Sequence, residues 1–172
     1  MRLRIIGTFI VLLSFVSLRT VAAIENEELI RASMLEKIAH FIEWPALTGE
    51  EFNICAFGNT SLLPALESYY LNSQFDKKSI KLISLNHSKA LLDCQIIYLD
   101  TTETRHLENI LNITKDHPIL VISEKKDSVS QGAHVDFFIE DSRLHLEVNR
   151  TALQKNHLSA SYHLLRVARI VD

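Results

Sequence analysis

The segment that decides the fold is Phe52-Asn53-Ile54-Cys55-Ala56-Phe57-Gly58. The residues before the glycine are mostly apolar, which indicates a buried strand, and Gly58 ends it. Three similar runs follow along the chain: Ile80 to Leu85, Gln95 to Leu99 and Ile119 to Ile122. Short strands of this kind, rich in β-branched residues, are typical of a sheet that is covered on both faces.

Segments with helical periodicity alternate with these strands. Between Glu25 and Glu43, apolar residues recur at helical spacing, and Trp44-Pro45 ends the pattern. Shorter helical patterns cover Leu62 to Leu71 and Thr104 to Ile113. Strands separated by helices in this way predict an α/β domain with a three-layer, Rossmann-like, mostly parallel sheet flanked by helices.

A β-hairpin and a helix are predicted to complete the domain. Two strand-like runs, His134 to Ile139 and Arg143 to Val148, flank the polar turn Glu140-Asp141-Ser142. If Glu140 faces Arg143, one face of the hairpin is apolar and must pack against the core. We interpret the opposite, polar face as solvated. The periodicity of Leu158 to Val171 predicts the final helix.

The chain opens with the features of a secretory signal peptide. Arg2 and Arg4 precede an apolar run from Ile5 to Leu18, and small residues follow at Val21-Ala22-Ala23. That run is shorter than the ~20 residues that cross a bilayer. We therefore expect cleavage after Ala23 and export of a single domain, residues 24–172.

The predicted mature domain is acidic. The signal segment contains three of the 18 lysines and arginines and none of the 21 acidic residues, which leaves 15 basic against 21 acidic residues. A negative domain of this kind argues against nucleic acid as a partner.

Two cysteines, Cys55 and Cys94, are present in the chain. A lone pair in an exported protein indicates a disulfide. The first and third strands of a doubly wound sheet are commonly neighbours, and Cys55 lies in the first while Cys94 opens the third. The bridge would close a loop of about 40 residues. The alternative is two unpaired, buried cysteines that pack as small hydrophobic side chains.

No catalytic motif is found in the sequence. It has no Gly-x-Ser-x-Gly elbow and no Cys-x-x-Cys pair, and the glycines after Ala23 are too few for a phosphate-binding loop. We therefore expect no catalytic residue and no cofactor. A metal site would have to use His134, Asp136 and Glu147 of the hairpin, but no known ligand spacing supports one.

Five segments in this order resemble the YfiR-like family of bacterial periplasmic proteins. They are His40-Phe41-Ile42-Glu43-Trp44-Pro45, Phe52 to Gly58, Cys94-Gln95-Ile96-Ile97-Tyr98-Leu99, Leu146-Glu147-Val148-Asn149 and Leu164-Leu165-Arg166-Val167-Ala168-Arg169-Ile170. The resemblance also matches Cys55 and Cys94 to the family's disulfide. A second cysteine pair that some relatives carry late in the chain is missing.

The resemblance implies a small, non-enzymatic periplasmic regulator, usually a homodimer. Its partner would be the periplasmic sensor domain of an inner-membrane diguanylate cyclase, which it restrains. An OmpA-like outer-membrane lipoprotein would withdraw it from that domain. Such a protein controls cyclic-di-GMP output, and through it attachment and biofilm.

A small-ligand-binding protein is the alternative function. Doubly wound folds bind ligands at the C-terminal edge of the parallel strands. In this chain that edge is expected near Gly58, Asp100 and Ser123. The residues that contact a protein partner are not predicted by the sequence.

Overall fold

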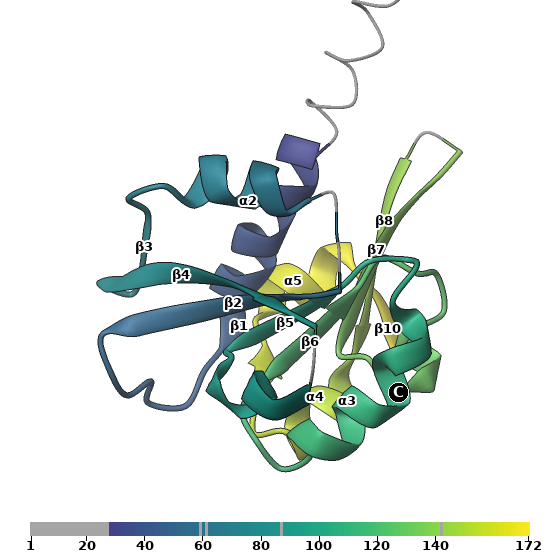
Figure 1. The fold of residues 1–172 in the computed structure, drawn as a ribbon. Coiled ribbons are helices and arrows are strands. Elements are labelled where there is room, and N and C mark those ends of the chain that lie inside the picture. Colours follow the sequence, from purple (N-terminus) through teal and green to yellow (C-terminus); the bar gives the residue numbers. More distant parts are fainter. Residues whose placement is uncertain (1–27, 59, 61, 87, 142) are drawn as a thin grey trace, which may run out of the picture.

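The computed structural model of the protein describes residues 28–58, 60, 62–86, 88–141 and 143–172, and the predicted signal peptide lies outside them. Within these ranges, the centre of the fold is an eight-stranded sheet of order β10-β8-β7-β6-β5-β2-β4-β3 (Figure 1). The parallel strands, in spatial order, are β4 (Lys78–Leu85), β2 (Glu51–Phe57), β5 (Ile96–Leu99), β6 (Leu120–Ser123) and β7 (Val135–Glu140). β3 (Gln74–Phe75) and β8 (Arg143–Asn149) run antiparallel to their neighbours β4 and β7. The predicted mostly parallel α/β sheet is confirmed.

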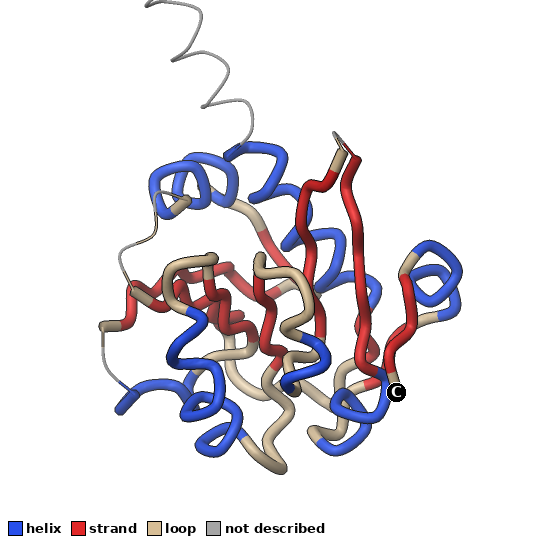
Figure 2. Tube along the Cα trace, turned by 90° about the vertical axis from the view of Figure 1, so that its right-hand side faces the viewer, coloured by secondary structure: helices blue, strands red, loops and turns tan. Residues whose placement is uncertain are grey.

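Helices cover both faces of the sheet, so the strands lie between helical segments in Figure 2. On one face, the N-terminal helix (residues 28–41), α2 (Leu63–Tyr70) and α5 (Tyr162–Val167) bury Leu35, Leu66 and Leu164 in the main core. On the other face, α3 (Leu107–Thr114) and the 3-10 segment η1 (Ser88–Asp93) pack over the Cys55 side of the sheet. A shorter 3-10 turn, η2 (Thr104–His106), leads into α3. These elements form the three layers that the sequence predicts.

The disulfide joins β2 to the residue that leads into β5, and the sheet reverses its order at these two strands. β2 lies between β4 and β5, and Cys55 is in register with Ile97 of β5. Cys55 and Cys94 are bonded, with their Cα atoms 5.9 Å apart. Both side chains are buried. The predicted disulfide is confirmed, and the alternative of two unpaired cysteines is wrong.

The first helix ends earlier than the sequence predicts. It stops at residue 41, and Ile42–Glu43 forms β1, which pairs antiparallel with β9 (Ser159–Ala160). Trp44 follows at once, and its Nε1 donates to the Ala39 carbonyl at 3.0 Å. Its ring also meets Phe52 edge-on, with 5.4 Å between the ring centroids. Trp44 therefore anchors the end of the helix to β2.

The hairpin forms in the predicted register, with Glu140 opposite Arg143. Its inner half packs as predicted, because Val135, Phe137 and Val148 are buried. Its outer half does not: Ile139 is 53% exposed and Leu144 is 44% exposed. β6 pairs with β7 only at Val135 and Asp136, so the tip extends past the sheet (Figure 1). The prediction that the whole apolar face packs on the core is wrong at the tip.

The prediction of a solvated polar face is wrong as well. Asp136, Glu147 and His134 are all buried on that face. The segment after β6, which includes η3 (Val129–Gln131), lies over Asp136, and the Val129 amide donates to its Oδ2 at 3.2 Å. The alternation of polar and apolar residues correctly identified the polar face of the hairpin. It could not predict that the segment after β6 covers this face, because that segment has no strong sequence pattern.

The C-terminal segment is not the single helix predicted over Leu158 to Val171. Ser161 caps a six-residue helix, α5, and Ala168 is extended, with φ −95° and ψ 152°. β10 (Arg169–Val171) then adds to the sheet parallel to β8, which suits its β-branched residues. The helix α4 (Arg150–Lys155) was not predicted from the sequence. Asn149 caps its N-terminus, and the Asn149 side chain accepts from the Ala152 amide at 2.8 Å.

Opening the disulfide should lower stability without changing the fold. The bridge spans 39 positions of sequence, and the chain-entropy model gives about 4 kcal/mol for a loop of that length. We expect urea unfolding of the dithiothreitol-treated protein to show a lower midpoint. The double variant Cys55→Ala, Cys94→Ala is the control for side effects of the reductant. Equal midpoints for the oxidised and reduced wild type would contradict this prediction.

Acid should destabilise the fold through His134. Its Nδ1 accepts from the Val121 amide at 2.8 Å, and burial lowers the pKa of His134 from 6.5 to about 4, despite a hydrogen bond to the Ala152 backbone. The unfolded chain therefore binds a proton at a higher pH than the folded one. The stabilisation is complete above pH 6.5 and is lost as the pH falls toward 4.

We expect His134→Gln to flatten the loss of unfolding free energy between pH 7 and pH 4.5, by on the order of 2 kcal/mol. His117, which is exposed, supplies the matched control His117→Gln, which should keep the wild-type slope. A wild-type slope in His134→Gln would argue against this origin of the acid sensitivity.

Candidate functional site

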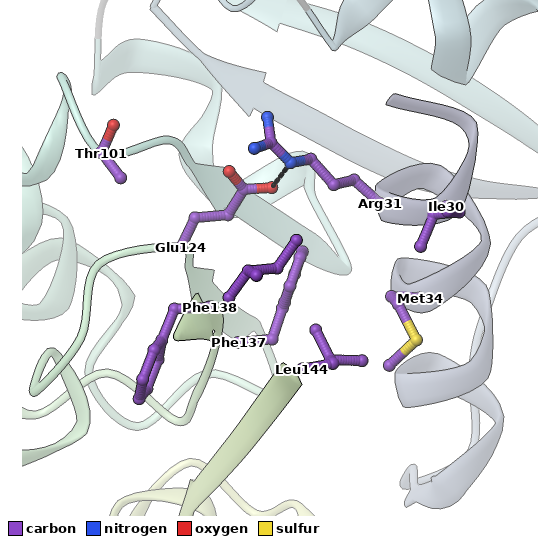
Figure 3. Close-up of a pocket in the computed structure, with 9 residues that line it drawn as sticks. Ile30, Arg31, Met34, Thr101, Glu124, Phe137, Phe138 and Leu144 are labelled. Carbon is purple, nitrogen blue, oxygen red and sulfur yellow. Dashed lines mark ion pairs between the residues drawn. The ribbon is translucent and has the colours of Figure 1, made fainter. Parts of the chain in front are cut away.

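A cavity of about 280 Å³ opens between the N-terminal helix and the β7–β8 hairpin (Figure 3). Its apolar walls come from both elements, with Ile30 and Met34 on the helix and Phe137, Ile139 and Leu144 on the hairpin. We call these five residues and the space between them the hairpin groove. Apolar walls that face each other across such a space can hold an apolar group of a ligand or partner.

An ion pair stands in the hairpin groove. Arg31 Nε lies 3.6 Å from Glu124 Oε1, and Figure 3 shows the pair beside the apolar side chains. The Glu124 side chain is only 8% exposed, so its charge requires partners within the protein. Tyr98 is one of them, because burial, the charge of Glu124 and a hydrogen bond to Glu124 all raise the pKa of Tyr98 and keep its hydroxyl protonated. The groove therefore offers a polar anchor within apolar walls.

The groove exists because the hairpin tip extends past the core. Ile30, Ile139 and Leu144 are 50%, 53% and 44% exposed. Covering apolar surface gains about 25 cal/mol per Å². Neighbouring side chains of this kind mark a binding surface more often than isolated ones do. The arrangement is suited to binding.

The C-terminal edge of the sheet lies beside the groove, but the residues of this edge that line the cavity are not the predicted ones. Gly58, Asp100 and Ser123 make internal contacts. A Cβ on Gly58 would clash with the Glu103 side chain. Asp100 Oδ1 accepts from the Thr102 amide at 2.8 Å, and Ser123 Oγ lies 2.9 Å from Ser128 Oγ. The cavity is lined instead by Thr101 and Glu124, which directly follow Asp100 and Ser123.

Sequence reasoning missed Arg31 and Glu124. One signal was available for Glu124, because it is the first charged residue after the buried strand β6, at the edge where doubly wound folds place their ligands. Arg31 had no comparable signal, since one arginine in an amphipathic helix usually faces solvent.

The hairpin residues considered for a metal, His134, Asp136 and Glu147, are held by other contacts. Nδ1 of His134 is bonded to the Val121 amide, and Glu147 is paired with Arg169 of β10. In the described ranges, no three side chains of His, Cys, Asp or Glu come together as metal ligands. No helix within those ranges has the length and apolarity needed to cross a bilayer.

Two solved structures share the fold. A conserved domain protein from Vibrio cholerae O1 biovar El Tor is 11% identical with a TM-score of 0.57, over 84% of this chain and 60% of that one. The ABC domain from Streptococcus pneumonia, in complex with L-Trp, is 9% identical with a TM-score of 0.52, over 70% of this chain and 55% of that one. This chain thus spans little more than half of those proteins, and the likeness concerns the fold alone.

The sequence itself identifies the family. No curated protein matches it. The model of the YfiR/HmsC-like family matches residues 28–169, a range that includes the N-terminal helix, both cysteines and the hairpin. The protein therefore belongs to the YfiR/HmsC-like family.

Proposed function

We propose that this protein is a non-enzymatic periplasmic regulator that binds the sensor domain of an inner-membrane signalling enzyme and restrains that enzyme. The observation that carries the proposal is its membership of the YfiR/HmsC-like family. The signalling enzyme is a diguanylate cyclase, so the protein lowers cyclic-di-GMP and thereby limits attachment and biofilm. It acts as a homodimer, and an OmpA-like outer-membrane lipoprotein withdraws it from the cyclase.

A location in the periplasm is supported by two features. The sequence of Met1 to Ala23 has the order of a secretory signal: basic residues, an apolar run and small residues. The Cys55–Cys94 disulfide is typical of an oxidising compartment.

We propose the hairpin groove as the contact surface for the sensor domain. Ile30, Ile139 and Leu144 of the groove are half exposed. Apolar side chains of this kind are suited to form the apolar centre of an interface with a partner. The Arg31–Glu124 pair beneath them can accept a polar group of the partner. A few buried side chains carry most of the energy of such an interface, so one charge placed at its centre should abolish binding.

The test compares two aspartate variants of equally exposed residues. Ile139 lies in the groove and is 53% exposed, and Leu92 lies in η1 on the opposite face of the sheet and is 51% exposed. We expect a tagged wild-type protein and Leu92→Asp to recover a diguanylate cyclase from native membranes, and Ile139→Asp to recover at least tenfold less, which is about 1.4 kcal/mol. Cyclic-di-GMP should rise in a deletion strain and return to normal with the wild type or Leu92→Asp.

The outcomes separate the function from the surface. Equal recovery by all three proteins would keep the regulator and reject the hairpin groove as the contact. A deletion strain with unchanged cyclic-di-GMP, together with no cyclase or kinase recovered, would reject the regulatory function.

A small-ligand-binding protein is the second candidate, and the cavity favours it. Apolar walls around an Arg31–Glu124 pair suit a compact molecule with an apolar body and a charged end. A ligand at 100 times its dissociation constant stabilises a protein by about 2.7 kcal/mol. In a thermal-shift screen of metabolites we therefore expect a rise of several degrees for the wild type with a true ligand, and a smaller rise for Glu124→Gln. A screen without any shift, alongside recovery of a cyclase, would decide against this candidate.

A further inference from the structure

We propose that the outer edge of β4 is the surface through which the protein forms a symmetric homodimer, by antiparallel pairing of β4 with the same strand of a second copy. The homodimer is part of the proposed function, on which this interface rests. The pairing joins the sheets of the two copies into one continuous sheet.

Only one end of the outer edge of β4 is covered. β4 has eight residues and pairs with β2 along its inner edge, from Ser79 to Leu85. Its outer neighbour β3 has two residues, pairs only with Lys78 and Ser79, and lies at one end of β4 in Figure 1. The Ile80 amide makes one further bond, to the Ser73 carbonyl at 3.3 Å. Beyond Ile80, the outer edge of β4 has no neighbouring strand among the described residues.

The backbone groups that point out from this open edge are those of Leu82 and Ser84. The Ser79 amide and the Leu85 carbonyl both bond on the β2 side. Successive residues of a strand direct their N–H and C=O groups to opposite sides, so Leu82 and Ser84 point away from β2. Across the described chain, no hydrogen bond meets the amide or the carbonyl of either residue. The edge therefore offers donors and acceptors to another strand.

The open part of the edge also lacks the usual protection against strand pairing. Native proteins protect exposed edges with charges, prolines, bulges or very short strands. The run Leu82-Ile83-Ser84-Leu85 contains no charge and no proline, and it keeps regular register with β2. The opposite edge of the sheet, β10, is protected, because it is three residues long and begins with Arg169. The β4 edge is thus the one suited to strand addition.

A second copy of β4 fits this edge by symmetry. In an antiparallel pair with a two-fold axis at Ile83, Leu82 lies opposite Ser84 of the second copy. Each of these residues then donates its amide to the carbonyl of the other, which satisfies both outward amides and both outward carbonyls of each copy. A two-fold axis along the strands would instead give a parallel pair with donor facing donor. The free groups of β4 therefore select the antiparallel homodimer.

The side chains are compatible with the same arrangement. Ile83 faces its own counterpart on the axis, where Cβ atoms lie about 5 Å apart. It is only partly buried beside the cluster under η1 and α3, so a second copy covers it further. Lys81, which pairs with Glu51 at 3.2 Å, lies opposite the uncharged Leu85. The dimer thus adds apolar contact and places no like charges face to face.

This interface closes the assembly and leaves the hairpin groove free. Because β4 pairs with itself, the dimer cannot extend into a fibre, as pairing of β4 with β10 would allow. The strands β2, β5 and β6 lie between β4 and the hairpin strand β7. Each copy therefore keeps its own hairpin groove for another partner.

Sedimentation analysis of the purified protein tests the interface with two variants of Ser84. Ser84→Pro removes the outward amide without breaking a bond inside the protein, since proline is tolerated on an edge strand where the N–H faces solvent. We expect it to weaken dimerisation by at least about tenfold, because each copy loses a hydrogen bond of the pair. Ser84→Ala keeps the amide and is the matched control, which should dimerise as the wild type does.

Amide hydrogen exchange of the wild type supplies a readout that needs no variant. Exchange at Leu82 and Ser84 should slow as the protein concentration rises and dimers form, because new hydrogen bonds protect these amides. Exchange at Ile83, whose amide points toward β2, should not depend on concentration. This contrast between neighbouring residues distinguishes strand pairing from contact through another surface.

The outcomes separate this interface from the proposed function. If the wild type is a dimer, equally tight dimerisation of folded Ser84→Pro, or exchange at Leu82 and Ser84 that ignores concentration, would keep the homodimer and reject the β4 edge. A wild type that stays monomeric at every concentration would reject both the interface and the homodimer, while recovery of a cyclase from membranes still decides the regulatory function. If Ser84→Pro does not fold, the exchange of the wild type alone decides.

Discussion

The pairing of β2 with β5 is the contact on which the rest of the structure depends. The chain leaves β2 toward β4 on one side and returns to β5 on the other, so every later strand is placed by this one pair. Cys55 of β2 is bonded to Cys94, which lies just before β5, on the side where η1 and α3 pack. The bridge thus fixes the order of the sheet on the side of that helical layer, and the N-terminal helix packs on the opposite face of the same strands.

From the β2–β5 pair toward β7, the residues of the sheet change from apolar to polar. One row of residues in register begins with Phe57 of β2 and Leu99 of β5, and continues with Ser123 and Asp136. Apolar burial therefore stabilises the first half, and hydrogen bonds and an ion pair stabilise the second. Apolar packing depends little on pH, whereas a buried carboxyl group such as Asp136, whose pKa is raised by burial, depends on it strongly. The end of the sheet that carries β8 and β10 is thus the part whose stability can respond to conditions.

The sequence predicted the parts of the fold that depend on local pattern. The predicted strands β2, β4, β5 and β6 contain short apolar runs, and the hairpin register followed from the single assumption that Glu140 faces Arg143. The elements that were predicted wrongly are those whose structure depends on tertiary contacts. β10 is a strand because β8 offers it an edge, although Leu158 to Val171 has helical periodicity.

The candidate site was less predictable than the fold, for a physical reason. Pattern fixes which face of a strand is apolar, but not whether anything lies over that face. Ile139 and Leu144 have the pattern of core residues and are half exposed, because the neighbouring strand ends before them. Asp136 and Glu147 have the pattern of surface residues and are buried, because the segment after β6 and Arg169 cover them. Both errors concern the length of neighbouring elements, which only the assembled sheet determines.

The two ends of the hairpin thus differ in what they can do, and β8 connects them. Leu144 stands in the groove and Glu147 lies opposite Asp136 of β7, three residues apart on one strand. The inner half is buried on both faces, at Val148 and at Glu147, so a small movement there changes close contacts rather than solvent exposure. The exposed tip of β8 therefore serves binding, and its buried inner half holds the sheet together.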